Sequence, residues 1–357
     1  MNYMNKYCPF LKFNDGELTA LFNLSSRDKS SIIPMLEIPR DDKCKEDKLI
    51  RKIDRCAKRM SKNLESSFSL FIDNLEVPDN ITINGYDNYL YIINSFSSFD
   101  IIPVIGFDRV SSHNDIGIEY ANKKSKKIAL RVTQDYYDNF FAYKRDLDDV
   151  LKRINSDVIN ILLLDCNYID DTAFMGKCKM NILKILYYIL KINKYSKIIL
   201  CGSSIPSPIG NKVKTGTSIF LTRNEILLYK EIVDSLKEIE ILFGDYTVVS
   251  PGYAEINIKP EAMYNVITPK IIYSKLDSQF VIRGYKIKTH GLDQYFSQAE
   301  TIIKESFYRG DDYSYGDKYL YEKAKYRGKN ITPSSIIGPT VNAHIKYMIE
   351  EINKGTI

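Results

Sequence analysis

Short apolar runs recur along this chain, and a charged residue ends or interrupts many of them. Examples are SSFSLFIDN at residues 66–74, KKIALRV at 126–132 and VINILLLDC at 158–166. Most runs are continuously apolar rather than alternating, which is typical of strands covered on both faces in a parallel sheet. The pattern predicts seven strands, at residues 32–38, 68–72, 101–107, 128–132, 158–164, 197–201 and 241–243.

Segments with a helical period lie between these runs. Residues 45–62 place one apolar stripe on a helix, made of Leu49, Ile50, Ile53, Cys56, Ala57 and Met60. The same spacing of apolar residues predicts further helices within residues 86–96, 139–154, 180–192 and 222–239. Strand and helix therefore alternate along the chain up to about residue 245, which indicates repeated βαβ units.

The number of these units predicts a (β/α)8 barrel, a TIM-like α/β fold. Two short strands within residues 270–287 supply an irregular eighth unit in the form of a hairpin. An open doubly wound sheet is the alternative, but no GxGxxG or GxxxxGK[ST] motif follows the first strand. We expect the barrel to span residues 1–289 and a helical extension packed on it to span residues 290–357.

Composition narrows the classes of function. The chain has 357 residues, 44% of them hydrophobic, and a net charge of only +5. That charge permits contact with nucleic acid but does not argue for it. Six scattered cysteines without a CxxC pair, and three histidines, make zinc sites and two-histidine catalysis poor candidates. No apolar segment reaches the roughly 20 residues of a membrane span and the opening residues lack a signal peptide's apolar centre, so we expect a cytoplasmic protein.

The charges at the strand ends are the main candidates for chemistry. In a (β/α)8 barrel, active sites lie where the carboxyl ends of the strands meet. Arg131 interrupts its strand between two apolar residues, and a buried charge is costly unless it is paired or used. The residues expected at this mouth are Glu37, Asp73, Asp165 and Asp245 as catalytic carboxylates, with Arg131, Ser203, Ser204, Tyr246 and Arg283 as ligand-binding residues.

Three uses of such a ring stay open at the level of sequence. Glu37, Asp73, Asp165 and Asp245 could hold a divalent cation such as Mg²⁺ or Mn²⁺, which prefers oxygen ligands. They could form an acid and base pair whose pKa values Arg131 pushes apart. They could also form a closed ion-pair network that only fills the mouth.

Three other features are weaker candidates. The loop CGSSIPSPIG at residues 201–210 has small residues and backbone amides that could cradle a phosphate, or it is only a turn. Residues 311–327 interleave tyrosine with lysine, which suits either nucleic-acid stacking or a solvated helix face. His344 shares an apolar helix stripe with Val341 and Met348, which favours a packing role.

Several segments spread over the whole chain form a recognisable set: residues 7–39, LFGDYTVVSP, FVIRGYKIK and the closing YRGDDYSYGDKYLYEKA and GPTVNAHIKYMI. Together and in this order they resemble the beta protein family of bacteria and phages. The family pattern falls on Tyr7, Pro9, Lys12, Gly16, Glu17, Pro34, Glu37, Gly244, Asp245, Tyr246, Arg283 and Gly284. Phe280 replaces the family's frequent Trp, and Ala343 replaces the first histidine of a late pair, which puts a catalytic role for that pair in doubt.

The resemblance implies a role in prophages or in defence against phages, without an established reaction. We therefore expect a barrel that binds a phosphate-bearing ligand, a nucleotide or a nucleic-acid end, at its mouth. If there is a reaction, we expect phosphodiester hydrolysis assisted by a divalent metal. The alternative is a non-catalytic sensor or scaffold that binds a phage protein or a partner nuclease; direct nucleic-acid binding through the lysine- and tyrosine-rich surface is a third.

Overall fold

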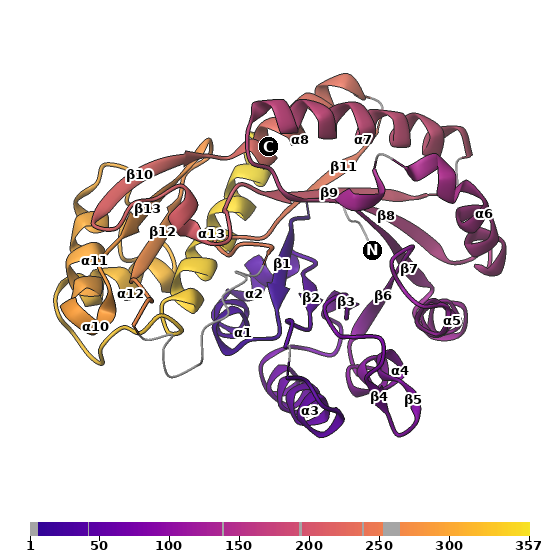
Figure 1. The fold of residues 1–357 in the computed structure, drawn as a ribbon, viewed down its shortest axis with the longest axis horizontal. Helices are drawn as coiled ribbons and strands as arrows, with labels where there is room; N and C mark the ends of the chain where they lie inside the picture. Colours follow the sequence, from indigo (N-terminus) through magenta and orange to yellow (C-terminus); the bar gives the residue numbers. More distant parts are fainter. Residues whose placement is uncertain (1–5, 42, 138, 193–194, 238, 253–264) are drawn as a thin grey trace.

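Eight parallel strands close into a barrel in the computed structural model (Figure 1). The structure describes residues 6–252 and 265–357, apart from residues 42, 138, 193–194 and 238. The strand order is β1-β11-β9-β8-β7-β6-β3-β2. The strands are β1 Cys8–Lys12, β2 Met35–Glu37, β3 Ser69–Asp73, β6 Asp100–Gly106, β7 Lys127–Thr133, β8 Ile159–Tyr168, β9 Lys197–Ser203 and β11 Ile241–Asp245. The predicted (β/α)8 fold is confirmed. The prediction about a signal peptide concerned the opening residues, and those before Lys6 lie outside the described part of the chain.

Helices surround the barrel, and most of them bury apolar side chains against it; the short α2 Ser26–Ser30 has no apolar residue and buries Asp28. In α3 the buried side chains are Leu49, Ile53, Cys56 and Met60, and Ile50 and Ala57 of the predicted stripe are only partly buried. These side chains join a core cluster between the strands and the outer helices. The helices of this layer are α1 Asp15–Phe22, α2 Ser26–Ser30, α3 Glu46–Asn63, α4 Asn88–Ser95, α5 Ser111–Tyr120, α6 Lys144–Arg153, α7 Thr172–Ile192 and α8 Asn224–Ser235.

The eighth strand of the barrel is β1, not the hairpin at residues 270–287. That hairpin forms β12 Lys270–Ser274 and β13 Ser278–Arg283, which pair with β10 Thr217–Thr222 in a separate antiparallel sheet. A hairpin reverses the chain and so cannot continue an all-parallel ladder. β1 pairs in parallel with β2 and β11 instead. Its five residues CPFLK contain a proline and a lysine, two residue types that are uncommon in buried strands, so the sequence pattern did not predict this strand.

The second sheet and the last helices form a layer on one side of the barrel, coloured orange and yellow in Figure 1. The helices are α10 Ile287–His290, α11 Gln294–Lys304, α12 Tyr315–Ala324 and α13 Ile337–Asn353, so the segment after residue 290 is helical as predicted. β12, β13, α11 and α12 share a third core cluster. α13 packs against both α1 and β12, and it thereby joins this layer to the barrel wall. The boundary at residue 289 stays a prediction.

Candidate site at the mouth of the barrel

The strands place alternate residues inside the barrel, and this period of two decides which charges meet. The interior is filled by an apolar layer that includes Phe10, Met35, Phe71, Ala129 and Leu163. Two residues further along the same strands, on the same side, stand Lys12, Glu37, Asp73, Arg131 and Asp165. Lys12 is paired in register with Glu37, and Glu37 with Asp73. Charges therefore replace the apolar layer at the carboxyl end.

Arg131 lies at the centre of this layer and bonds to every carboxylate around it. Its Nη1 donates to Asp73 at 2.7 Å and also to Glu37. Its Nε donates to Asp165 at 3.1 Å, and its Nη2 donates to Asp165 and to the Tyr246 hydroxyl, the latter at 2.9 Å. All five N–H groups of the guanidinium are thus used. We call Glu37, Asp73, Arg131, Asp165 and Tyr246 the Arg131 cluster.

A second guanidinium, Arg109, extends the Arg131 cluster and was missed in the sequence. Its Nη2 donates to both oxygens of Asp73 at 2.8 Å, and its Nη1 donates to Asp108. Its Nε–H is buried and has no hydrogen-bond partner among the described residues. Its position in the sequence could have identified it as a site residue. Arg109 stands two residues after the predicted strand 101–107, in the kind of loop that carries active-site residues in such barrels.

Burial and charge act in opposite directions on the groups of the Arg131 cluster. Burial alone would raise the pKa of Asp73, but Arg109 and Arg131 outweigh it and lower that pKa to about 2. Burial would lower the pKa of Arg131, yet Glu37, Tyr246 and the two aspartates raise it well above its ordinary value. Burial and Asp165 raise the pKa of Tyr246, so its proton stays on the phenol and is donated to Asp165 at 2.7 Å.

Two further titratable groups at the edge of the mouth were not predicted as site residues. Burial, and then Glu37, raises the pKa of Glu76, three residues beyond Asp73. Burial lowers the pKa of Lys12, against the influence of Glu37. Burial thus favours the uncharged form of both side chains, although each is near the charged groups of the Arg131 cluster.

Asp245 does not belong to the ring, although the sequence places it at the mouth. It stands one residue before Tyr246, which faces the interior, so its own side chain points outward. There it accepts from Tyr7 and from Arg223 Nη2, the latter at 2.6 Å, and lies 3.0 Å from His344 Nε2 on α13. Asp245 therefore lies outside the Arg131 cluster, and this geometry gives no support to its predicted catalytic role at the mouth.

The partners of Asp245 form a closed network outside the barrel wall. Ser274 Oγ lies 2.6 Å from His344 Nδ1, and Arg223 Nε donates to Glu225 at 2.7 Å. Burial lowers the pKa of His344, against the influence of Asp245. We call Tyr7, Arg223, Asp245, Ser274 and His344 the Asp245 network. Its His344 is buried with both ring nitrogens in contact with polar atoms, so the predicted packing role is confirmed.

Three other predicted ligand-binding residues lie outside the Arg131 cluster. Arg283 is on β13 in the separate sheet, where it donates to Thr268 at 3.0 Å and to the Val213 carbonyl at 2.6 Å. Ser203 accepts from its own loop at the Ile205 amide. Ser204 accepts from the Asn224 amide at 2.8 Å at the start of α8. The two serines therefore serve local structure at the end of β9, and a phosphate cradle there stays a prediction.

The carboxylates do not fit a divalent cation in this arrangement. Within the described part of the chain, no group of three or more His, Cys, Asp and Glu side chains could hold a metal ion. Glu37, Asp73 and Asp165 all direct oxygens at Arg131 instead. Bringing a cation to the same oxygens would require Arg131 to leave. We therefore derive no step through Mg²⁺ or Mn²⁺.

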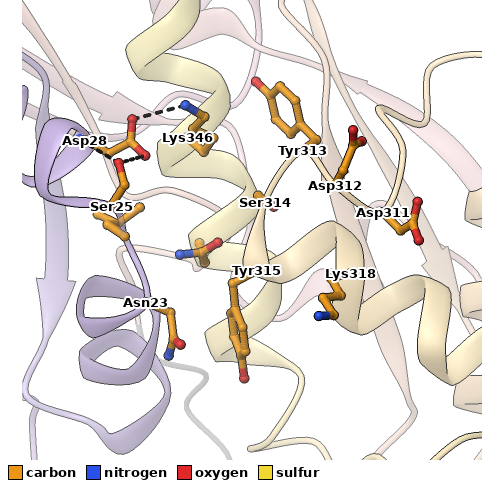
Figure 2. A pocket seen from close by; sticks show the side chains of 12 residues that line it. Asn23, Ser25, Asp28, Asp311, Asp312, Tyr313, Ser314, Tyr315, Lys318 and Lys346 are labelled. Atoms are coloured by element: carbon orange, nitrogen blue, oxygen red, sulfur yellow. Dashed lines mark hydrogen bonds and ion pairs between the residues drawn. The ribbon is translucent and has the colours of Figure 1, made fainter.

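A separate polar cleft of about 600 Å³ lies between the barrel's first helices and the C-terminal layer (Figure 2). One wall carries the ion pair of Asp28 with Lys346 at 3.1 Å, and the start of α12 brings Tyr315 and Lys318. Residues from the first part of the lysine- and tyrosine-rich segment line this cleft. Further along that segment, Lys323 donates to the carbonyls of Arg327 and Lys329, so it holds the loop after α12 against the helix.

Comparisons with known proteins address family and fold. A family model described as "Beta protein" matches residues 7–350. No curated protein matches the sequence. No helix in the described residues is long and apolar enough to span a membrane.

Two solved structures illustrate the level of structural likeness. One is the catalytic module of a family 98 glycoside hydrolase from Streptococcus pneumoniae, at 12% identity and a TM-score of 0.40, covering 70% of this chain and 49% of that chain. The chain thus spans about half the length of that module. The other is dihydropteroate synthase from Thermus thermophilus, at 12% identity and a TM-score of 0.36, covering 69% of this chain and 90% of that chain. At this level neither structure bears on substrate.

Proposed function

The chain belongs to the Beta protein family, and we propose that the mouth of its barrel binds a phosphate-bearing ligand such as a nucleotide or a nucleic-acid end. A role in prophages or phage defence stays a prediction from the family resemblance. The proposal concerns binding, and it assigns no reaction.

The convergence of buried charges supports a ligand site at the mouth. Five ionic groups from different strands and loops meet at the end of the barrel where such folds place their sites: Glu37, Asp73, Arg109, Arg131 and Asp165. Well-packed apolar residues of similar volume would often be as stable as a buried ion network. A network kept at this position is therefore a candidate for function as well as for structure.

The buried Nε–H of Arg109 is the observation that carries the proposal. A buried donor without an acceptor costs about 1–3 kcal/mol, so its presence favours an acceptor that arrives with a ligand. Phosphate oxygens are strong acceptors for guanidinium groups. Arg131 has no N–H group left to donate to a phosphate, because all five already donate to the carboxylates and to Tyr246. It therefore acts as a positioning residue for the carboxylates.

The charge balance at the mouth also bears on the ligand. The carboxylates paired with the two arginines are Glu37, Asp73, Asp108 and Asp165, and the cations are Arg109, Arg131 and Lys12. Four negative charges thus face three positive ones. A phosphate would depend on direct hydrogen bonds from cationic donors rather than on a positive field, which makes Arg109 and Lys12 the groups to test.

Thermal denaturation with phosphate probes tests the proposal. We expect ADP to raise the Tm of the wild-type protein, since a ligand that binds only the folded state stabilises it by mass action. Arg109→Lys keeps the charge but changes the donor geometry, and it should abolish the shift. Arg51→Lys, on an exposed arginine of α3, is the matched control and should keep it. Inorganic phosphate should act in the same way at higher concentration.

Two outcomes would overturn the proposal. One is a shift with ADP that Arg109→Lys leaves unchanged, which would move the site elsewhere. The other is the absence of any shift with ADP or phosphate while an uncharged sugar raises Tm, which would make the ligand neutral. Circular dichroism of Arg109→Lys shows whether the variant is folded before either result is read.

The alternative of a non-catalytic sensor or scaffold needs a different test from removal of the C-terminal segment. α13 supplies His344 to the buried Asp245 network, so deleting it would remove one partner of Asp245 and uncover the ion pair of Asp245 with Arg223. Loss of a partner after such a deletion would not separate docking from unfolding. Surface substitutions on an intact protein avoid this difficulty.

A further inference from the structure

Helix α7 has a second apolar stripe, on the face that points away from the barrel. Its inner face is buried through Cys178, Ile182, Ile185 and Ile189, as expected for a barrel helix. On the opposite face Met180 is 58% exposed, Tyr187 54% and Leu190 41%. We call Met180, Tyr187 and Leu190 the α7 stripe. In Figure 1 α7 runs along the outside of the barrel beside α8.

The spacing of the α7 stripe matches a helix-packing seam. Met180 and Tyr187 are seven residues apart, and Leu190 follows three residues later. Residues at these intervals lie on one side of a helix over about three turns. Exposed apolar residues scattered singly need no explanation, but a row along one helix marks a surface that another element covers.

Charge along one edge of the α7 stripe indicates the partner's chemistry. Exposed lysines recur at the same seven-residue interval, at Lys177, Lys184 and Lys191. The sequence of α7 contains no aspartate or glutamate. A second copy of the chain would bring the same lysines against them, which disfavours self-association through this face. A partner with carboxylates at the flanking positions would complement them.

We propose that the α7 stripe docks an amphipathic helix of a partner protein, with an apolar seam and acidic residues along its edge. The lysines steer the acidic edge and fix the register, and the three apolar side chains supply the buried area. A membrane surface is disfavoured because the opposite face of α7 is held in the barrel core and only three apolar side chains are available to insert. The proposal does not depend on a ligand at the mouth.

A designed peptide tests the docking surface directly. The probe is a fluorescent helix of about three heptads with leucines along its seam and glutamates at the flanking positions; the control peptide carries lysines instead. We expect the glutamate peptide to bind the full-length protein, to bind less tightly as salt rises, and to exceed the lysine peptide in affinity. Tyr187→Glu should weaken binding by about tenfold or more. Tyr86→Glu, on an equally exposed tyrosine far along the chain, should not.

A charge swap makes the test specific. The double variant Lys184→Glu, Lys191→Glu should lose the glutamate peptide and gain the lysine peptide. Equal binding of the two peptides, or no binding of either to a folded wild-type protein, would overturn the proposal. So would a wild-type dimer in light scattering that Tyr187→Glu converts to a monomer. Co-sedimentation with phosphatidylserine vesicles that Tyr187→Glu abolishes, without peptide binding, would assign the stripe to a membrane instead.

Discussion

The Arg131 cluster and the Asp245 network start from the same local device and end on opposite sides of the barrel wall. In each, an aspartate ends the apolar run of a strand, and the amide two residues later donates to one of its oxygens, from Asn167 to Asp165 and from Thr247 to Asp245. β11 ends at Asp245, whereas β8 continues past Asp165 to Tyr168 with a shift of register. Both amides belong to residues with positive φ, 52° and 59°. Yet Asp165 faces the interior and Asp245 faces α13. The same turn therefore serves two sites, and only the direction of the side chain separates them.

The two regions differ in the kind of polar group that is left without a partner. In the Asp245 network each of the five named side chains has a hydrogen-bond partner, and α13 covers them from outside. Next to it, the neutral hydroxyl of Thr247 is buried without a partner among the described residues. At the mouth the group without a partner is a charged donor, Arg109 Nε–H. A charged donor favours an anionic acceptor more strongly than a neutral hydroxyl does, which supports the proposal of a ligand at the mouth.

Removing Arg131 should have the largest effect and would break the inner region alone. Arg131→Met leaves Glu37 and Asp165 buried without their guanidinium, and we expect a loss of about 3–5 kcal/mol in the free energy of unfolding. Urea denaturation measures it. Arg131→Lys keeps a charge with fewer donors and should lose less, which covers the case where the first variant does not fold. Arg51→Met, in an exposed pair with Asp47, should cost at most about 1 kcal/mol. Equal stability of Arg51→Met and Arg131→Met would contradict the role of the cluster.

The pH dependence of stability should separate the two regions. The pKa of Asp73 is about 2 in the folded protein, below its unfolded value of about 4. Such a carboxyl stabilises the fold fully above its unfolded pKa and loses that contribution, about 3 kcal/mol, as pH falls toward its folded pKa. His344 also has a lowered folded pKa, so the unfolded chain takes up its proton first and stability falls as pH drops below about 6.5.

Variants separate the contributions of the two regions. His344 and Arg223 lower the pKa of Asp245 against burial, so the outer network also contributes to the acid window. Only the part of that window that Asp73→Asn removes belongs to the mouth. Unfolding free energies of Asp73→Asn should vary less with pH than those of the wild type between about pH 4 and 2. His344→Gln should vary less between about pH 7 and 5. If either substitution flattened both windows equally, the two regions would be coupled rather than separate.

Among these variants, Ser274→Ala should have the smallest effect on the free energy of unfolding. It tests the Asp245 network without touching the Arg131 cluster. It removes the hydroxyl beside His344 Nδ1 and should cost about 1 kcal/mol in unfolding free energy. Because Ser274 lies outside the barrel wall, the Tm shift produced by ADP should stay the same. A lost ADP shift in this variant would link the outer network to the mouth.

The sequence predicted the barrel, most of its strands and every member of the Arg131 cluster. Glu37, Asp73, Arg131 and Asp165 end or interrupt apolar runs that the structure confirms as strands. Arg109 escaped notice because it stands in a loop, where no period marks it. β1 escaped because five residues with a proline and a lysine at the start of the chain give little strand signal.

Asp245 and Arg283 show why the remaining assignments needed coordinates. Both end apolar runs just as Asp165 does, but β13 lies in another sheet and β11 turns Asp245 outward. In strands buried on both faces, the inward and outward positions are equally apolar, so the sequence does not reveal which side the final charge takes.

The sequence by itself determined the order of strands and helices and the positions of the charges among them. Both depend on the spacing of apolar and charged residues that are neighbours in the chain. Tertiary structure alone decided which strand closes the barrel and which charges meet. Those outcomes depend on partners far apart in the chain, such as Arg131 with Glu37 across 94 residues and Asp245 with His344 across 99. No local pattern specifies such pairs.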